Sequence, residues 1–224
     1  MKSNRTTATT IAGSLYLLGF VAGILSIAYA IDDPNYLIQA SKSVNATLVA
    51  AFFHLLMAPI YLGIAISLYP DLKQYNQWLA FGFAAFRSIA SVLLFIGAII
   101  TLLLLILSQE FVSAGSPAIS HYQTIGVILQ SGRDLTNHVA TILAVNFGGL
   151  LLYTLVLRAK LIPRWLSVWG LIGTILTIIA SYLVMFQLLE IITPTYIIMN
   201  SPMALQEIVL GLWLVIKGFN TSET

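Results

Sequence analysis

The sequence has no cysteine and very little charge. Only 8% of its 224 residues are Asp, Glu, Lys or Arg. Without cysteine, the chain can form no disulfide, no thiolate metal site and no cysteine nucleophile. Ten basic and eight acidic residues leave a net charge of +2, too small and too scattered to indicate binding to nucleic acid or another polyanion.

Apolar residues are abundant instead, at 59% of the chain. A typical soluble domain is about a quarter charged and less than half apolar. The longest apolar runs exceed the roughly 20 residues that a helix needs to cross a bilayer. The sequence therefore predicts an all-α, polytopic protein whose first partner is the lipid bilayer.

Six segments are long and apolar enough to be transmembrane helices, and we expect them to form one bundle in a single domain over residues 1–224. They cover residues 9–31, 44–69, 78–107, 135–157, 165–189 and 202–217. The first segment ends in Ala28-Tyr29-Ala30, which resembles a signal-peptide cleavage site. Its length and its Gly19/Gly23 pair, suited to helix packing, favour a retained span.

The short loops carry an uneven distribution of Lys and Arg. With the N-terminus inside, the inner side carries Lys2, Arg5, Lys73, Arg158, Lys160, Arg164 and Lys217, and the outer side carries Lys42 and Arg133. Basic residues prefer the cytoplasmic side of a membrane, and tryptophans prefer the interface. All four tryptophans (Trp78, Trp165, Trp169 and Trp213) fall near the inner ends of spans. We expect both termini to be cytoplasmic.

The longest loop lies between the third and fourth spans. Apolar residues recur at Ala118, Tyr122, Ile125 and Leu129, which is helical spacing. This pattern predicts a short interfacial helix on the outer leaflet. A lid over a cavity is the alternative.

Polar residues inside the spans are the main functional signal, since a charge at the bilayer centre costs at least about 2.5 to 3.5 kcal/mol. Arg87 lies near the middle of the third span, and Glu207 lies in the sixth. We predict that these two pair, directly or through water. The whole set clusters in the middle and outer half of the bundle, and it predicts a polar cavity there: Arg87, Glu207, Gln206, His54, Asp134, Asn137 and His138.

Three functions fit this pattern. The first is a non-enzymatic protein that binds or moves a small or lipidic ligand in an outward-facing polar pocket. The second is an intramembrane hydrolase with a metal held by His54, Asp134 and His138, since a catalytic zinc needs three protein ligands. The third is a structural or assembly subunit in which the charges only lock helices. No catalytic motif occurs and no cofactor is indicated, so we favour the first.

Several motifs together are similar to a known family. The most specific are Leu161-Ile162-Pro163-Arg164-Trp165-Leu166-Ser167-x-Trp169-Gly170 and the terminal Glu207-x5-Trp213-Leu214-Val215-Ile216-Lys217-Gly218-Phe219. The chain resembles the prokaryotic integral-membrane family of domain of unknown function 4386. This resemblance implies a six-helix domain in a bacterial or archaeal plasma membrane, and it implies no activity. Members often carry a glutamate three residues after the third-span arginine. Here that position is Ala90, which leaves Glu207 as the partner of Arg87.

Overall fold

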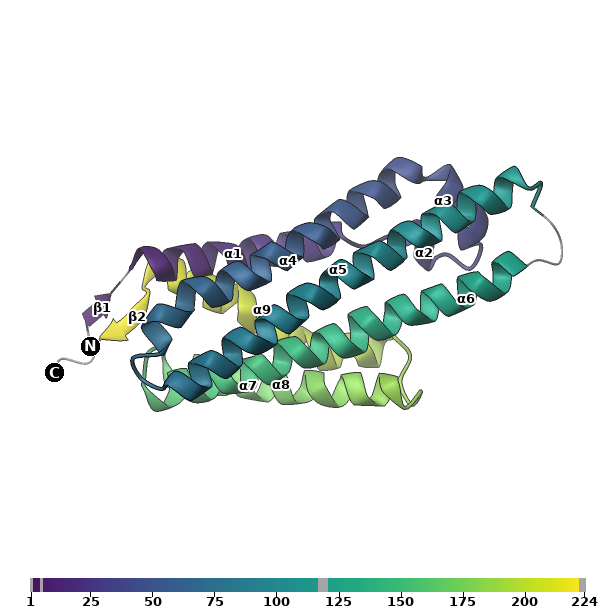
Figure 1. Cartoon of the computed structure of the whole chain (residues 1–224). Coiled ribbons are helices and arrows are strands. Elements are labelled where there is room, and N and C mark those ends of the chain that lie inside the picture. Colours follow the sequence, from purple (N-terminus) through teal and green to yellow (C-terminus); the bar gives the residue numbers. More distant parts are fainter. Residues whose placement is uncertain (1, 5, 117–120, 222–224) are drawn as a thin grey trace.

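Six long apolar helices make up most of the chain in this computed structural model, which describes residues 2–4, 6–116 and 121–221 (Figure 1). They are α1 (Thr7–Leu25), α4 (Val44–Leu72), α5 (Gln77–Ser113), the continuous helix His121–Arg158, α8 (Arg164–Met185) and α9 (Pro194–Ile216). The fourth of these consists of α6 (His121–Asp134), a π-helix η1 (Leu135–Thr141) and α7 (Ile142–Arg158). The predicted all-α, six-span fold is confirmed.

The shorter elements lie at the two ends of the bundle. Helices α2 (Tyr29–Asp32) and α3 (Tyr36–Lys42) connect α1 to α4. Strands β1 (Lys2–Asn4) and β2 (Phe219–Thr221) pair antiparallel, so the two chain termini lie at the same end (Figure 1). We call this the terminal end, and the opposite end, with α2 and α3, the far end.

The long helices form a closed ring in sequence order. Helix α1 packs on α4, α4 on α5, α5 on α7, α7 on α8, α8 on α9, and α9 returns to α1. The first and last helices meet through glycines: a Cβ on Gly13 would lie 2.6 Å from the carbonyl oxygen of Gly211. The Gly19/Gly23 pair faces α4 at greater separation, since a Cβ on Gly23 would lie 3.7 Å from Met57 Cε.

The terminal end is closed by short connections and large apolar side chains. The α4–α5 and α7–α8 turns cover only residues 73–76 and 159–163. The backbone N–H of Asn220 donates to the Leu161 carbonyl at 2.7 Å, which ties the C-terminal strand to the α7–α8 turn. The core at this end is made of fully buried side chains from five of the helices and their turns: Leu68, Leu72, Phe83, Leu155, Leu161, Leu166 and Leu214.

The far end is built differently, because α5 is longer than a membrane requires. Its 37 residues correspond to about 55 Å of helix at 1.5 Å per residue, against about 30 Å of hydrocarbon. The far part of α5 packs against α3 and α6 around a second apolar cluster that includes Ile31, Leu37, Leu104 and Phe111. This extension stands beyond the α8–α9 turn (Figure 1).

Helix α6 occupies the loop in which an interfacial helix is predicted. It runs through η1 into α7 as one continuous helix and packs along α5. Its position relative to the lipid headgroups stays a prediction, and Ala118 lies outside the described residues.

The ends of the helices are set by capping residues more than by the limits of the apolar runs. Helix α9 begins at Pro194, not near residue 202, because Thr193 is its N-cap and accepts a hydrogen bond from the Tyr196 N–H at 3.3 Å. Proline at the first helical position after such a cap is a favoured start. Helix α1 ends at Leu25, earlier than the apolar run to residue 31 suggests.

All four tryptophans belong to the parts of α5, α8 and α9 that are nearest the terminal end. The side chain of Trp78 is 81% exposed in the described structure, as an interfacial anchor would be. Which side of the membrane this end faces stays a prediction, and Arg5 lies outside the described residues.

Candidate functional site

An ion pair joins α5 and α9 in the middle of the ring. A guanidinium nitrogen of Arg87 lies 3.1 Å from Glu207 Oε1. Arg87 is 1% exposed, whereas the Glu207 side chain keeps 24% of its surface accessible. The predicted pairing of these two residues is therefore confirmed and is direct. Its two partners differ, because only the carboxylate reaches open space.

Aromatic rings surround the guanidinium of Arg87. Its carbon lies 5.0 Å from the ring centre of Tyr61, 5.3 Å from that of Tyr16 and 5.8 Å from that of Phe83. A guanidinium N–H of Arg87 also donates a hydrogen bond of 3.3 Å to the Tyr16 hydroxyl. Cation–π contacts in such a desolvated place are worth up to about 2 kcal/mol each. The rings explain how α5 holds a buried cation with a single carboxylate partner.

Gln206 is adjacent to Glu207 in sequence, but its side chain contacts different helices. Its Oε1 accepts a 2.7 Å hydrogen bond from the Tyr153 hydroxyl, and its amide nitrogen donates to the Leu166 carbonyl at 3.2 Å. Gln206 is fully buried. It therefore connects α7, α8 and α9 beside the terminal-end core, and it does not line the cavity described next.

A cavity of about 980 Å³ lies between the helices on the far side of the ion pair. We call it the central cavity. Its wall includes Glu207, reaches outward past His54 and Tyr196, and ends at exposed residues such as Tyr29 and Pro34. A second cavity of about 240 Å³ adjoins it and is lined by Arg87 and Glu207 among others. Of the seven predicted site residues, the wall of the central cavity contains His54, Asn137, His138 and Glu207. Arg87, Gln206 and Asp134 are not part of that wall, and Glu207 lies in the walls of both spaces.

His54 and Asn137 meet across a glycine of α5. A Cβ on Gly97 would overlap Asn137 Oδ1 and would lie 3.1 Å from His54 Cε1. Both side chains line the central cavity, and His54 is 8% exposed. Two residues separated widely in sequence thus share one site because Gly97 lets them approach α5 closely.

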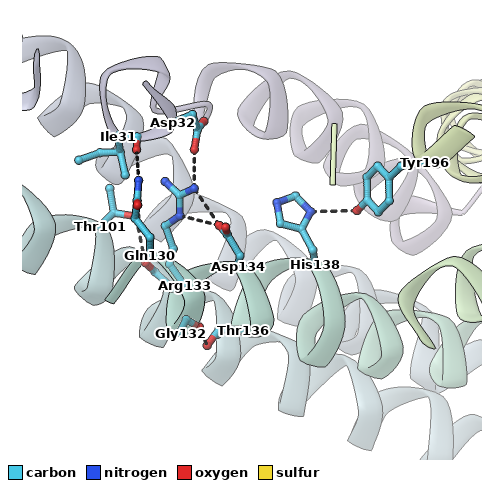
Figure 2. A network of polar contacts seen from close by, with 11 residues as sticks. Ile31, Asp32, Thr101, Gln130, Gly132, Arg133, Asp134, Thr136, His138 and Tyr196 are labelled. Carbon is cyan, nitrogen blue, oxygen red and sulfur yellow. Dashed lines mark hydrogen bonds and ion pairs between the residues drawn. The ribbon is translucent and has the colours of Figure 1, made fainter. Parts of the chain in front are cut away.

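The π-helix η1 places a second group of polar side chains on the cavity wall. It carries Asn137, His138 and Thr141, all of which line the central cavity. His138 Nδ1 and the Tyr196 hydroxyl of α9 are hydrogen-bonded at 2.9 Å (Figure 2). A π-turn within an α-helix shifts the side-chain register, and such turns are frequent at functional sites.

An acidic and basic cluster lies toward the outer limit of the central cavity. Figure 2 shows Arg133 between Asp32 of α2 and Asp134, and both carboxylates are bonded to its guanidinium. Gln130 donates a 2.7 Å hydrogen bond to the Ile31 carbonyl in the same region. These contacts attach α2 to the last part of α6, just before η1.

The three residues of the metal alternative do not form a metal site. Among the described residues, no three His, Asp or Glu side chains lie close enough together to hold one ion. Asp134 faces Arg133, His138 faces Tyr196, and His54 packs on Gly97. Since each ligand must reach about 2 Å from one metal, this donor set does not fit a catalytic zinc.

Four polar atoms on the cavity wall are buried without a hydrogen-bond partner. They are Asn137 Oδ1, Asn146 Oδ1, Thr141 Oγ1 and Thr177 Oγ1. Buried polar groups are almost always paired, so these four atoms identify residues of the wall whose hydrogen-bonding capacity the described protein atoms leave unused.

Most lining residues of the central cavity are outside the predicted site, and three of them show why sequence reasoning misses such residues. Tyr196 falls before the predicted sixth span, although the Thr193-Pro194 cap signals an earlier helix start. Asp32 reads as a loop residue. Thr177 carries no signal at all, since a threonine in a transmembrane helix is usually bonded to its own backbone.

Comparisons with known proteins give one result. Neither curated proteins nor solved structures match the chain. A family described as a domain of unknown function, DUF4386, matches residues 11–218, which is nearly the whole chain and includes every residue of the ion pair and of the central cavity. The chain therefore belongs to the DUF4386 family.

Proposed function

We propose that this protein binds a small amphiphilic or lipidic ligand in its central cavity. The observation that carries the proposal is a space of about 980 Å³ with unpartnered polar atoms in its wall, inside a bundle of apolar helices. Ligand cavities in proteins measure roughly 300 to 1,000 Å³ and combine apolar walls with a few placed polar groups. This cavity has both properties.

The wall is divided in a way that suits an amphiphile. Met57, Leu94, Ile142 and Val145 supply apolar surface from three elements, which would accept an alkyl or aromatic portion. Glu207 and the buried polar atoms would accept a polar head group. A head group inside the bundle needs such partners, because an unpaired polar group away from water costs several kcal/mol.

We also propose that the cavity opens to the outside of a bacterial or archaeal plasma membrane, with both termini in the cytoplasm. The Lys and Arg bias of the loops supports this orientation. The apolar core at the terminal end separates the cavity from the cytoplasmic side. Binding, as in a sensor, needs no further change, whereas transport would require that core to open.

One observation favours a purely structural role as the second candidate. The guanidinium of Arg87 already has a carboxylate and three aromatic rings as neighbours, which is enough to lock α1, α4, α5 and α9 together. A structural role, however, gives no use to the unpartnered atoms of the cavity wall.

A pair of neighbouring residues on α9 provides the test. Ala204 lines both cavities, whereas Leu205 is 54% exposed and lines neither. Ala204→Trp should fill the cavity, and Leu205→Trp is the matched control. The protein is reconstituted in phosphatidylcholine nanodiscs, and binding of octylammonium, octanol and octanoate is measured by equilibrium dialysis.

We expect at least one probe to bind the wild-type protein saturably. Ala204→Trp should weaken that binding by about tenfold or more, which corresponds to the loss of well-packed contacts, and Leu205→Trp should leave it unchanged. Probe uptake that is equal in all three proteins reflects the lipid alone and would refute the proposal.

A further inference from the structure

We infer that the head group of this ligand is a protonated amine, held by Glu207 and the buried amide oxygen of Asn146 in the central cavity. The inference rests on the proposed function and names its ligand class. It is carried by the kinds of unpartnered atoms on the wall and by the balance of charge around them.

Asn146 indicates which kind of hydrogen-bonding group a ligand would have to supply. Its amide nitrogen donates a 2.8 Å hydrogen bond to the Ile142 carbonyl, and this bond fixes the orientation of the amide. The atom left without a partner is therefore Oδ1, which can only accept. The residue is 3% exposed and lines the central cavity. A ligand that satisfies it must supply an N–H or O–H donor.

The other unpartnered atoms on the wall agree with this reading. The hydroxyls of Thr141 and Thr177 can accept as well as donate. Asn137 Oδ1 is also an acceptor, but it packs against Gly97, ten residues or about 15 Å along α5 from Arg87, so it does not belong to the same head-group site. The one buried nitrogen without a partner among the described residues is Arg87 Nε. This nitrogen offers no donor to a ligand in the central cavity, because Arg87 lies outside the wall of that cavity and its guanidinium is packed among aromatic rings.

The charges on the wall favour a cation. Its acidic residues are Asp32, Asp33 and Glu207, and its basic residue is Arg133. That single base is already shared between Asp32 and Asp134. Asp32 and Asp33 lie at the outer opening, where they attract cations toward the cavity. At the inner limit Glu207 is paired with Arg87, so the attraction there comes from the carboxylate oxygen that Arg87 leaves unbonded.

The level of Asn146 along the bundle and the aromatic face of Tyr61 place the amine at the inner limit of the central cavity. A Cβ on Gly148 would lie 3.2 Å from Phe86 Cβ, so Asn146, two residues outward on α7, lies near the level of Arg87 and its partner Glu207. Only Glu207 Oε1 is bonded to Arg87, which leaves the carboxylate with capacity for a second donor. Tyr61 adds an aromatic face to the same wall.

An anion fits the same site poorly. Both nearby guanidinium groups are already paired with carboxylates, and an incoming anion at the inner limit would face the carboxylate of Glu207. A neutral alcohol has one donor, whereas an ammonium group has three. The structure thus ranks an alkylammonium above an alkanol, and an alkanol above an alkanoate.

The test compares four probes with the same eight-carbon chain: octylammonium, octyltrimethylammonium, octanol and octanoate. Protein in phosphatidylcholine nanodiscs is dialysed against each probe, and the uptake by the Ala204→Trp protein is subtracted as the lipid background. Octylammonium should bind about tenfold tighter than octanol or octanoate, as expected for a charge-assisted hydrogen bond. Octyltrimethylammonium has the charge without an N–H, so it should bind more weakly than octylammonium.

Two variants identify the groups that hold the amine. Glu207→Gln removes the negative charge and should abolish the preference for octylammonium over octanol. Asn146→Leu leaves the ion pair intact, so it remains informative if the first variant does not fold. It should weaken octylammonium binding by about tenfold and so remove most of the same preference.

The outcomes separate the inference from the proposed function. Octanol or octanoate that binds as tightly as octylammonium, with sensitivity to Ala204→Trp, would overturn the amine and leave the cavity a binding site. An octylammonium preference that survives both variants would also overturn it. Absence of Ala204-sensitive binding for all four probes would remove the proposed function and the amine with it.

Discussion

The two halves of this ring of helices differ in their centres, because large side chains fill the half at the terminal end and the other half encloses the central cavity. At the terminal end, leucines and a phenylalanine fill the centre, and short turns with the β1–β2 pair hold the helices together. At the far end, asparagines, threonines and histidines face the centre and enclose about 980 Å³. The ion pair of Arg87 and Glu207 lies between the halves.

The difference teaches how a ring of six helices is filled. Its centre is too wide for backbones alone to close, so large side chains must meet there, and apolar ones interdigitate at the terminal end. Polar side chains at the far end are held back by bonds to their own helices. Asn146 to Ile142 and Asn200 to Tyr196 are two such bonds. The space that remains is where a ligand would be bound.

The largest expected effect comes from breaking the boundary between the halves. Glu207→Gln leaves the buried charge of Arg87 without a counter-charge, and we expect a loss of about 3 to 5 kcal/mol in the free energy of unfolding. Arg87→Met should cost less, because the carboxylate of Glu207 reaches the cavity and can be hydrated there. Unfolding in mixed micelles with increasing dodecyl sulfate measures both.

The double variant Arg87→Met/Glu207→Gln separates the pair from its surroundings. It should be more stable than the sum of the single losses predicts, since neither partner is left alone. Strictly additive losses would show that the two side chains act independently and that the ion pair does not stabilise the bundle.

A smaller effect should distinguish the two halves directly. Leu214 is fully buried at the terminal end, and Leu94 is 3% exposed but lines the central cavity. Leu214→Ala opens a new void in a packed core and should cost about 2 to 5 kcal/mol. Leu94→Ala only enlarges a space that is already there, so we expect a smaller loss, near the lower limit of about 2 kcal/mol, without the penalty for a new cavity. Equal losses in the same unfolding titration would contradict the contrast between a solid and a hollow half.

Several features were accessible from the sequence, because each follows from a strong local signal. Long apolar runs predict six spans, and the high cost of intramembrane charge makes Arg87 and Glu207 natural partners. Helix ends are harder, since apolar runs do not mark them. The cap at Thr193 starts α9 well before the apolar run does, and this shift puts Tyr196 inside α9, although the apolar run alone leaves it in a loop.

The cavity itself could be foreseen only in outline. The sequence places polar residues in the outer half of the bundle, but the meeting of His54 and Asn137 depends on Gly97 of a third helix. The partner of Gln206 depends on the relative rotation of α7 and α9, which brings Tyr153 to it. A one-dimensional pattern contains no information on such rotations, so Gln206 was assigned to the cavity although it faces the terminal-end core.

The most direct test of the hollow far half uses the absence of cysteine from the chain. Thr177 of α8 lines the central cavity, and Thr174, one turn closer to the terminal end, is fully buried with its hydroxyl 3.6 Å from Met203 Sδ. Thr177→Cys and Thr174→Cys are each treated with a small cationic methanethiosulfonate in nanodiscs, and the reaction rates are compared. We predict that Cys at position 177 reacts at least about ten times faster and that octylammonium slows it, as a shared cavity requires. Equal rates at the two positions, or a rate at position 177 that octylammonium leaves unchanged, would contradict the account.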